Sequence, residues 1–433
     1  MSAEGFWLFE GLEEEPYGLL PLVNLSGKGG PTSTKYVERI GSYQWYLADD
    51  GPTILMPGMP LESFFWPGGK LQQDRGVVIY DVNHLKHPAF GPNGNRLPVP
   101  GLDPIGPGGF QRVRDGPLDT AILAARHLTS KTKKPINFNE FDFITDAVNL
   151  QKLFAFAQEA GDGLFRIDVE RIGKTVLLTR TYKCAHVIDE LKNYFDVPFH
   201  NFRMEASDLM EIGHVTFDQA LKRKMTKSRS KFTSGPFFQL VQYQFGNFKL
   251  LVRFEVDCAD YAAVKAASEN NPDMENEPQP EKKHFEENTS IEYMEYGSVP
   301  RDLPLQLLTT YPQGAGFPFF TWAQLFFTTG DQEIVGWFKG NGDFTKPAMN
   351  SLADISKLMK PLPYAVLSKV HDCLAKISKF MIKNDADFKC ALVWKGKNHL
   401  EIFAKDPNAG SALSAGVKAY LQTQCTEPEQ QDE

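Results

Sequence analysis

The sequence predicts an α+β fold in which a mixed, largely antiparallel sheet packs against helices. Two hairpin patterns carry this prediction. In residues 164–182, LFRIDVE and TVLLTRTY flank a short RIGK turn, and in residues 236–257, Gly246-Asn247 separates two apolar runs. Gly and Asn tolerate the positive φ angles that tight hairpin turns require, so both segments are expected to be antiparallel strand pairs.

Helices are expected where the apolar residues recur every three or four positions. One helix follows Asp146, a plausible N-cap, and stops near Gly161; its apolar face comprises Leu150, Leu153, Phe154 and Ala157. A long helix is predicted over residues 364–383, followed by a final hairpin formed by FKCALVW and HLEIFAK. These helices supply the second layer of the predicted fold.

Composition divides the chain into three parts. Residues 1–115 are rich in Gly and Pro and are expected to wrap over the core as loops with edge strands. Residues 116–408 are predicted to form the core domain, and residues 409–433 a C-terminal helix and tail. Within the core, the acidic residues 265–289 contain almost no large apolar side chain and are expected to form an exposed, disordered loop.

Bulk properties restrict the class of protein. The chain has 433 residues, 42% of them apolar, which is enough to bury a substantial core. The net charge is −8, so any nucleic acid would have to be held by a local basic surface. No signal peptide or membrane span is evident, and no preference for DNA is evident either. Five scattered cysteines predict reduced thiols in an intracellular protein, nuclear or cytoplasmic: Cys184, Cys258, Cys373, Cys390 and Cys425.

The stretch LVRFEVDCADYA, residues 251–262, places two carboxylates on one face of a predicted strand. Apolar and polar residues alternate, so that Glu255 and Asp257 share a face with Arg253, opposite Val252, Phe254 and Val256. Three interpretations are open at this point: a metal site, the remnant of one, or the solvated face of a sheet.

A basic run, LKRKMTKSRSK, covers residues 221–231 and is the clearest cluster of positive charge. It could contact RNA phosphates at the mouth of a groove, and the alternative is a solvated helix face or loop. The candidate RNA-binding residues are Lys222, Arg223, Lys224, Lys227 and Arg229.

Over roughly residues 75–405, the order of motifs resembles the decapping exoribonuclease (DXO) family, and more closely its fungal-type branch. The segments that carry the resemblance include DFITDAVNLQKLF, HNFRMEAS, LVRFEVDC, SIEYMEYG and AQLFFTTGDQEIVGWFKGNGDF. The resemblance implies a PD-(D/E)XK nuclease-like sheet that binds Mg²⁺ or Mn²⁺ and acts on RNA 5′ ends. In that chemistry, carboxylates hold the cations and a lysine of an ExK element beside them stabilises charge.

The resemblance also assigns roles to individual residues. Glu255 and Asp257 match the ExD element, Glu205 an upstream glutamate, and Glu292 the glutamate of the ExK element. These four are the candidate metal ligands, and Glu255, Asp257 and Glu292 the candidate catalytic residues. Met294 stands where this alignment requires the lysine.

Two further polar positions of the family pattern also differ. An arginine of the pattern falls at or near Ala147, and a glutamine is replaced near Thr329. Arg253, on the same face as Glu255, could be a relocated cation. We expect Glu292 to lie on the strand next to that of Glu255.

These substitutions favour a catalytically impaired or inactive relative of RNA 5′-end decapping nucleases that binds RNA, a nucleotide or a protein partner. The alternative is an active metal-dependent decapping nuclease using Glu205, Glu255, Asp257 and Glu292. A third interpretation is that Glu255 and Asp257 only form the solvated face of a sheet.

Overall fold

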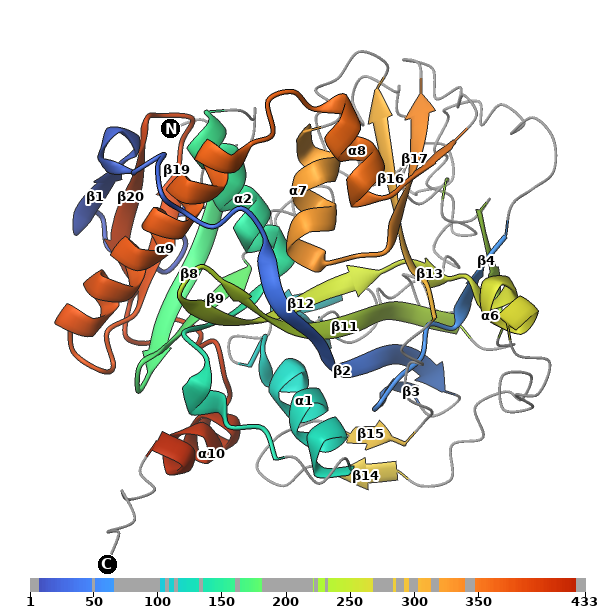
Figure 1. Ribbon diagram of the computed structural model, residues 1–433. Coiled ribbons are helices and arrows are strands. Elements are labelled where there is room, and N and C mark those ends of the chain that lie inside the picture. Colours follow the sequence, from blue (N-terminus) through green and yellow to red (C-terminus); the bar gives the residue numbers. More distant parts are fainter. Residues whose placement is uncertain are drawn as a thin grey trace, which may run out of the picture.

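The computed structural model describes residues 8–48, 51–65, 102–105, 109–112, 116–131, 135–159, 164–180, 221, 225–229, 233–267, 283–285, 292–295, 303–312, 319–338 and 347–425. A twelve-stranded sheet runs through the centre of the protein (Figure 1). Its strand order is β1 (Gly18–Pro21), β20 (His399–Ala404), β19 (Cys390–Trp394), β8 (Phe165–Ile172), β9 (Thr175–Arg180), β7 (Phe143–Asp146), β12 (Phe248–Val256), β11 (Thr233–Phe245), β2 (Thr34–Ala48), β3 (Gly51–Leu55), β15 (Glu292–Met294) and β14 (Lys283–Phe285).

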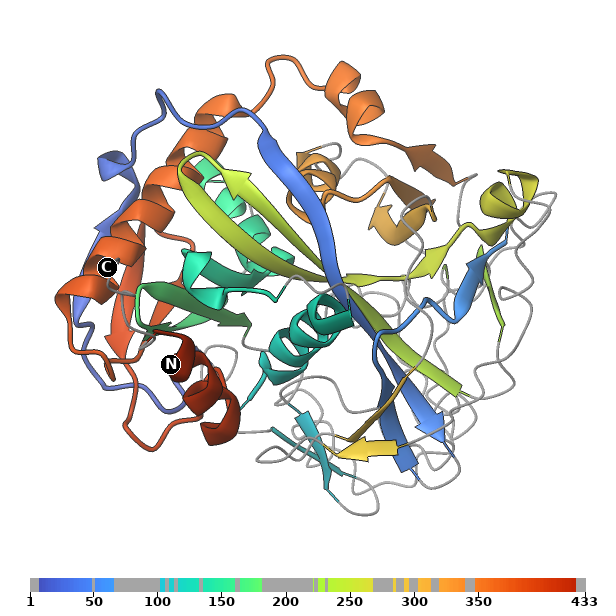
Figure 2. The same ribbon diagram turned by 60° about the horizontal axis from the view of Figure 1, so that its bottom comes forward.

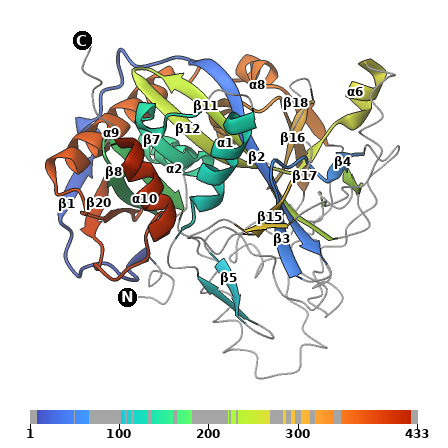
Figure 3. The ribbon, with the colours of Figure 1, turned by 90° about the horizontal axis from the view of Figure 1, so that it is seen from below.

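A second sheet has six strands, in the order β10 (Thr226–Ser228), β4 (Glu62–Phe64), β13 (Cys258–Ala259), β16 (Leu305–Pro312), β17 (Gln332–Phe338) and β18 (Ala348–Asn350). A separate hairpin consists of β5 (Leu102–Ile105) and β6 (Gly109–Arg112) (Figure 3). The helices of the described residues are α1 (Asp119–Lys131), α2 (Ala147–Gln158), α6 (Tyr261–Ala267), α7 (Phe319–Thr328), α8 (Leu352–Leu358), α9 (Tyr364–Lys383) and α10 (Ala415–Cys425), with short 3₁₀ turns at Leu22–Asn24 and Phe138–Glu140.

The predicted fold class is confirmed. Within the large sheet, β7 pairs in parallel with β9 and β12, and β15 pairs in parallel with β3, while the other neighbours are antiparallel. The Gly246-Asn247 turn joins β11 to β12, and the RIGK turn joins β8 to β9, as expected. No helix in the described part of the chain combines the length and the apolar character needed to cross a membrane.

Helices cover both faces of the large sheet, and the alternation along β12 decides which residues meet which layer. Val252, Phe254 and Val256 belong to the core cluster that includes residues of α2, α7 and α9, whereas Leu251 faces the cluster formed with α1. Figure 1 shows α1 and α2 on opposite sides of β11 and β12. Each fully buried aliphatic or aromatic side chain contributes about 1.5–3 kcal/mol relative to exposure.

The helix bounds follow local signals. α9 spans the predicted residues 364–383. α2 begins directly after Asp146, as predicted, but the Asp146 side chain makes no cap hydrogen bond. The helix ends at Gln158 because Glu159 adopts the left-handed conformation, with φ 58°; the expected stop at Gly161 lies outside the described residues.

Two expectations about irregular segments need correction. β2 was expected to be part of an edge region, yet it lies inside the large sheet between β11 and β3 (Figure 2). Its length allows it to pair with β11 along almost its whole course. β1 does lie at an edge of this sheet, since it pairs only with β20 among the described strands.

The second correction concerns the acidic segment. Residues 283–285 form the edge strand β14 against β15, and residues 265–267 complete α6, so residues 265–289 are not entirely irregular. The remainder of that segment lies outside the described residues. The division of the chain into three parts stays a prediction.

A buried charge network joins β8 to residues 8–10 and to Lys405, directly after β20. Arg166 donates to the Asp168 carboxylate through Nε, at 2.5 Å, and through its Nη2. Lys405 Nζ donates to Asp168 Oδ2 at 2.8 Å, and Arg166 Nη1 donates to the backbone oxygens of Leu8 and Glu10. Burial alone would raise the pKa of Asp168, but the Arg166 guanidinium and the Lys405 ammonium lower it well below its usual range.

We predict that Lys405→Met lowers the free energy of unfolding by about 3 kcal/mol or more, because it leaves buried carboxylates without one cation. The matched control is Lys397→Met, which removes an exposed lysine beside Glu401 and should cost less than about 1 kcal/mol. Chemical denaturation of both variants measures the difference. Equal losses in the two variants would contradict a stabilising role for the network.

The lowered pKa of Asp168 predicts how the stability of the folded protein changes with pH. Because the folded-state pKa lies below the unfolded one, the contribution of this carboxylate to stability is fully present above about pH 4 and is lost as the pH falls through the folded pKa. Asp168→Asn should therefore be less stable than the parent at pH 7, and the gap should narrow below about pH 4. Urea midpoints at pH 7 and pH 3 test this, and a constant gap would contradict it.

Candidate functional site

The end of β12 carries the two candidate carboxylates. Glu255 is exposed and lies opposite Phe238 of β11 in the antiparallel register. Asp257 follows directly after the strand and is half-buried. The predicted strand and its alternation are therefore confirmed, with Asp257 one residue beyond the strand end.

Asp257 connects the two sheets. Its backbone N–H donates to the carbonyl of Gln306 at 3.1 Å, and its Oδ2 accepts the backbone N–H of Leu308 at 2.6 Å. Both partners belong to β16 of the six-stranded sheet. One of its carboxylate oxygens thus already satisfies a backbone donor of a buried residue.

The strand to which Asp257 is hydrogen-bonded, β16, contains no charged residue. Gln306 is fully buried, donates through Nε2 to Gln332 Oε1 at 3.1 Å and accepts a long contact from Cys258 Sγ at 3.6 Å. Leu308, two positions further and therefore on the same face, is also buried. Leu305, Leu307 and Thr309 complete this part of β16, so residues 305–309 contain neither carboxylate nor ammonium group.

Arg253 is held inside the protein. Its Nε and Nη2 donate to the two oxygens of Asp146 at 2.6 Å and 3.0 Å, and its Nη1 donates to the Pro117 carbonyl at 2.7 Å and to the Tyr43 hydroxyl at 3.2 Å. Only 3% of Arg253 is exposed. The guanidinium is therefore committed to structural partners, which argues against its replacing a phosphate-binding cation. Burial raises the pKa of Tyr43 to about 12, although Arg253 opposes the shift, so the hydroxyl stays protonated.

The placement expected for Glu292 is wrong. Glu292 begins β15, which is separated from β12 by β11, β2 and β3. Adjacent strands are ~4.8 Å apart, so along the sheet the two backbones are about four such spacings apart. Met294 is buried on β15, and its carbonyl accepts the N–H of Met56 at 2.8 Å. The local sequence pattern fitted, but strand pairing depends on contacts distant in sequence.

The described residues do not by themselves form a divalent-cation site. Hard cations take about six oxygen ligands, several of them carboxylates. Within the described part of the chain, no three His, Cys, Asp or Glu side chains lie close enough to share a metal ion. Glu205 and the side chain of Glu292 lie outside the described residues, so their assignment as ligands stays a prediction.

The basic run is described in part. Lys227 and Arg229 lie on and just after β10, each beside an aromatic ring, whereas Lys222, Arg223 and Lys224 lie outside the described residues. Sequence reasoning missed the aromatic partners, Phe65 and Tyr261, because they are distant in the chain from the basic run. It also missed the pairing of Asp146 with Arg253, since Asp146 was interpreted only as a helix cap.

We predict that Asp257→Ala lowers the free energy of unfolding by about 1–3 kcal/mol, because the Leu308 N–H loses its acceptor. Asp257→Asn keeps a side-chain oxygen at this place and should cost clearly less. Thermal denaturation of both variants in EDTA provides the measurement without any contribution from metal ions. Equal stability of the alanine variant and the parent would contradict the junction role of Asp257.

Comparison with known proteins gives matches among solved structures only. No protein-family model matches the sequence, and no curated protein matches it either. Solved structures do match. The S. pombe Rai1 structure in complex with 3′-FADP is 13% identical, with a TM-score of 0.53 over 89% of this chain and 99% of that one.

Two yeast structures match over a larger share of the chain. Scheffersomyces stipitis Rai1, in complex with (3′-NADP)⁺ and calcium ion, is 13% identical, with a TM-score of 0.58 over 94% of this chain and 99% of that one. Candida albicans Rai1, in complex with pU5-Mn²⁺, is 15% identical, with the same TM-score and coverage. The chain therefore has the Rai1 fold, and the fold implied by the resemblance to decapping exoribonucleases is confirmed.

Proposed function

We propose that this protein binds an RNA 5′ end or a nucleotide through its Rai1 fold and hydrolyses it poorly or not at all. The fold supports the first half of the proposal, because the matching Rai1 structures contain pU5, (3′-NADP)⁺ or 3′-FADP. The arrangement around Asp257 supports the second half.

The observation that carries the proposal is the strand next to Asp257. If an ExK element has to stand on the strand to which the ExD aspartate is hydrogen-bonded, then β16 is that strand, and it presents Gln306 and Leu308 at the required i, i+2 spacing. An amide and an isobutyl group can replace neither a metal-binding carboxylate nor a charge-stabilising ammonium. Loss of one such group typically costs two to three orders of magnitude in rate.

The rest of the site supports the same conclusion. Arg253 is neutralised by Asp146, and Asp257 is partly used by the Leu308 N–H. Introducing lysine at Met294 should not restore activity, because β15 is not adjacent to β12. Two of the matching Rai1 structures contain calcium ion or Mn²⁺, which supports a role for a divalent cation in binding, so binding is measured with and without Mn²⁺.

The test separates binding from turnover in one set of samples. Binding of 5′-monophosphorylated pentauridylate is measured by calorimetry in EDTA and in Mn²⁺, and release of mononucleotide is followed in Mn²⁺. We predict that the parent binds pentauridylate. We also predict that its release of mononucleotide does not depend on Glu255, so that the parent and Glu255→Gln show the same background release. Glu14→Gln, at an exposed position before β1, is the matched control.

Two outcomes would contradict the proposal. Rapid release over many turnovers by the parent and by Glu14→Gln, abolished in Glu255→Gln, would establish an active nuclease, the alternative that uses Glu205, Glu255, Asp257 and Glu292. If the parent binds neither pentauridylate nor 3′-NADP, the nucleotide-binding role is contradicted and a protein partner is favoured.

A further inference from the structure

One edge of the six-stranded sheet carries two cations stacked on two aromatic rings. Lys227 Nζ lies 3.6 Å from the centroid of the Phe65 ring, and the Arg229 guanidinium carbon lies 3.9 Å from that of Tyr261. Lys227 is exposed, and Phe65 and Arg229 are half-buried. We call these four residues the β10 platform.

Backbone hydrogen bonds fix two members of the platform. Phe65 N–H donates to the Met225 carbonyl at 2.7 Å, and Arg229 N–H donates to the Leu61 carbonyl at 2.8 Å. Between these bonds, β10 pairs with β4 in an antiparallel register that places Lys227 opposite Ser63. Met225 is fully buried, so the start of β10 is anchored in the core.

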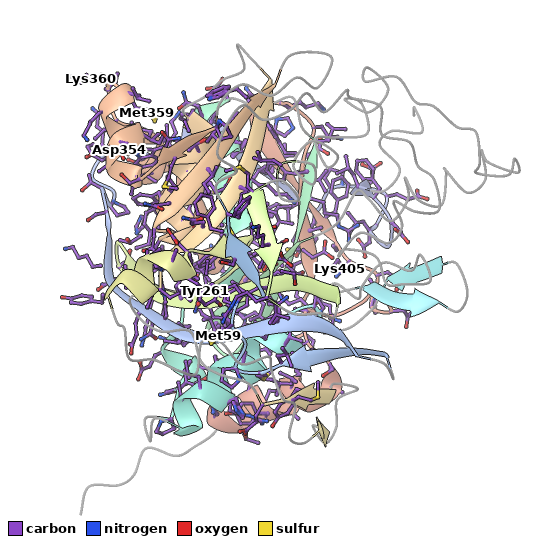
Figure 4. The ribbon with its side chains drawn as sticks, turned by 90° about the vertical axis from the view of Figure 1, so that its right-hand side faces the viewer. Met59, Tyr261, Asp354, Met359, Lys360 and Lys405 are labelled. Carbon is purple, nitrogen blue, oxygen red and sulfur yellow. The ribbon has the colours of Figure 1, made fainter. Side chains whose placement is uncertain are left out.

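Tyr261 is fixed from the other side. It begins α6, is only 4% exposed, and its hydroxyl donates to the Pro60 carbonyl at 2.6 Å. Figure 4 shows Tyr261 close to Met59, the residue that precedes Pro60. The ring is thereby held as a rigid base for the Arg229 guanidinium.

The platform lies near the end of β12. β4 pairs with β13 through Ser63 and Ala259, and Ala259 follows Asp257 by two residues. Lys227 and Ala259 thus lie on either side of Ser63, about two strand spacings of ~4.8 Å apart. A short single strand could therefore contact the platform and the vicinity of Glu255 and Asp257 together.

The chemistry of the platform fits single-stranded nucleic acid. Proteins bind such strands by pairing cations that follow the phosphates with aromatic faces on which bases stack. A lysine that only prevents edge-to-edge pairing of strands needs no aromatic partner. Here both described cations of the run have one, in a protein whose overall charge of −8 would repel a polyanion.

We propose that the β10 platform binds the body of a single-stranded RNA, downstream of its 5′ end, through phosphate contacts of Lys227 and Arg229 and base stacking on Phe65. This rests on the proposed function for the direction of the strand. The platform itself requires neither a 5′ phosphate nor a metal ion.

The test uses a fluorescent oligouridylate of about ten nucleotides, once with a 5′ hydroxyl and once with a 5′ monophosphate, in EDTA and over a range of salt concentrations. Lys227→Ala should weaken binding of both strands and reduce the slope of log affinity against log salt by about 0.7. Phe65→Leu should weaken both by about five- to tenfold, with little change in slope. Lys357→Ala, which removes an exposed lysine on α8, is the matched control.

The outcomes distinguish the platform from the proposed function. Unchanged oligonucleotide affinity in both platform variants, with folding verified by thermal denaturation, would overturn the platform and leave the proposed function intact. So would binding of 3′-NADP by a parent that binds no 5′-hydroxyl strand. Displacement of the RNA by an equally charged oligoglutamate at equal concentration would also overturn it, because the surface would then bind any polyanion. Equal affinity for the 5′-hydroxyl and 5′-monophosphate strands, weakened in both platform variants and without any 3′-NADP binding, would support the platform and contradict the proposed function.

Discussion

The bidentate ion pair between Arg253 and Asp146 is the contact on which the centre of the fold depends. It connects β12 to the end of β7 and the start of α2, and the same guanidinium also binds Tyr43 of β2 and the carbonyl of Pro117 just before α1. A buried guanidinium is costly unless its donors are satisfied, and here four donated bonds satisfy it. Five segments of the chain are thereby fixed at one point, two residues before the exposed Glu255 on β12.

The three polar residues on one face of β12 differ in burial and in their partners. Arg253, Glu255 and Asp257 look equivalent in the sequence, but each has a different role in the structure. Arg253 is committed to the interior, Asp257 joins two sheets through Leu308, and Glu255 alone is exposed to solvent. One face of one strand in a fold shared with Rai1 thus carries three polar residues in three different environments, and any function depends on such a site and not on the fold.

Local features could be predicted from the sequence, and long-range pairings could not. The Gly246-Asn247 hairpin and α9 follow from turn chemistry and helical periodicity, which involve neighbours in the chain. The partner of Asp257 could not be recognised, because Gln306 and Leu308 carry no charged motif. The Glu292-Tyr293-Met294 segment had the right local alternation, but its position in the sheet depends on pairing with β3, far away in the sequence. The basic run was visible, whereas its aromatic partners Phe65 and Tyr261 were not.

The buried network around β8 has a consequence for the order in which the molecule forms. Arg166 binds carbonyls of Leu8 and Glu10, and Asp168 beside it binds Lys405, 237 positions further along the chain. Contacts of such long sequence separation form late, since the chain between them must first be closed into a loop. During synthesis on the ribosome, the carboxylates of β8 lack the Lys405 ammonium until residue 405 has been added. This end of the sheet can therefore close only after the chain has been made as far as Lys405.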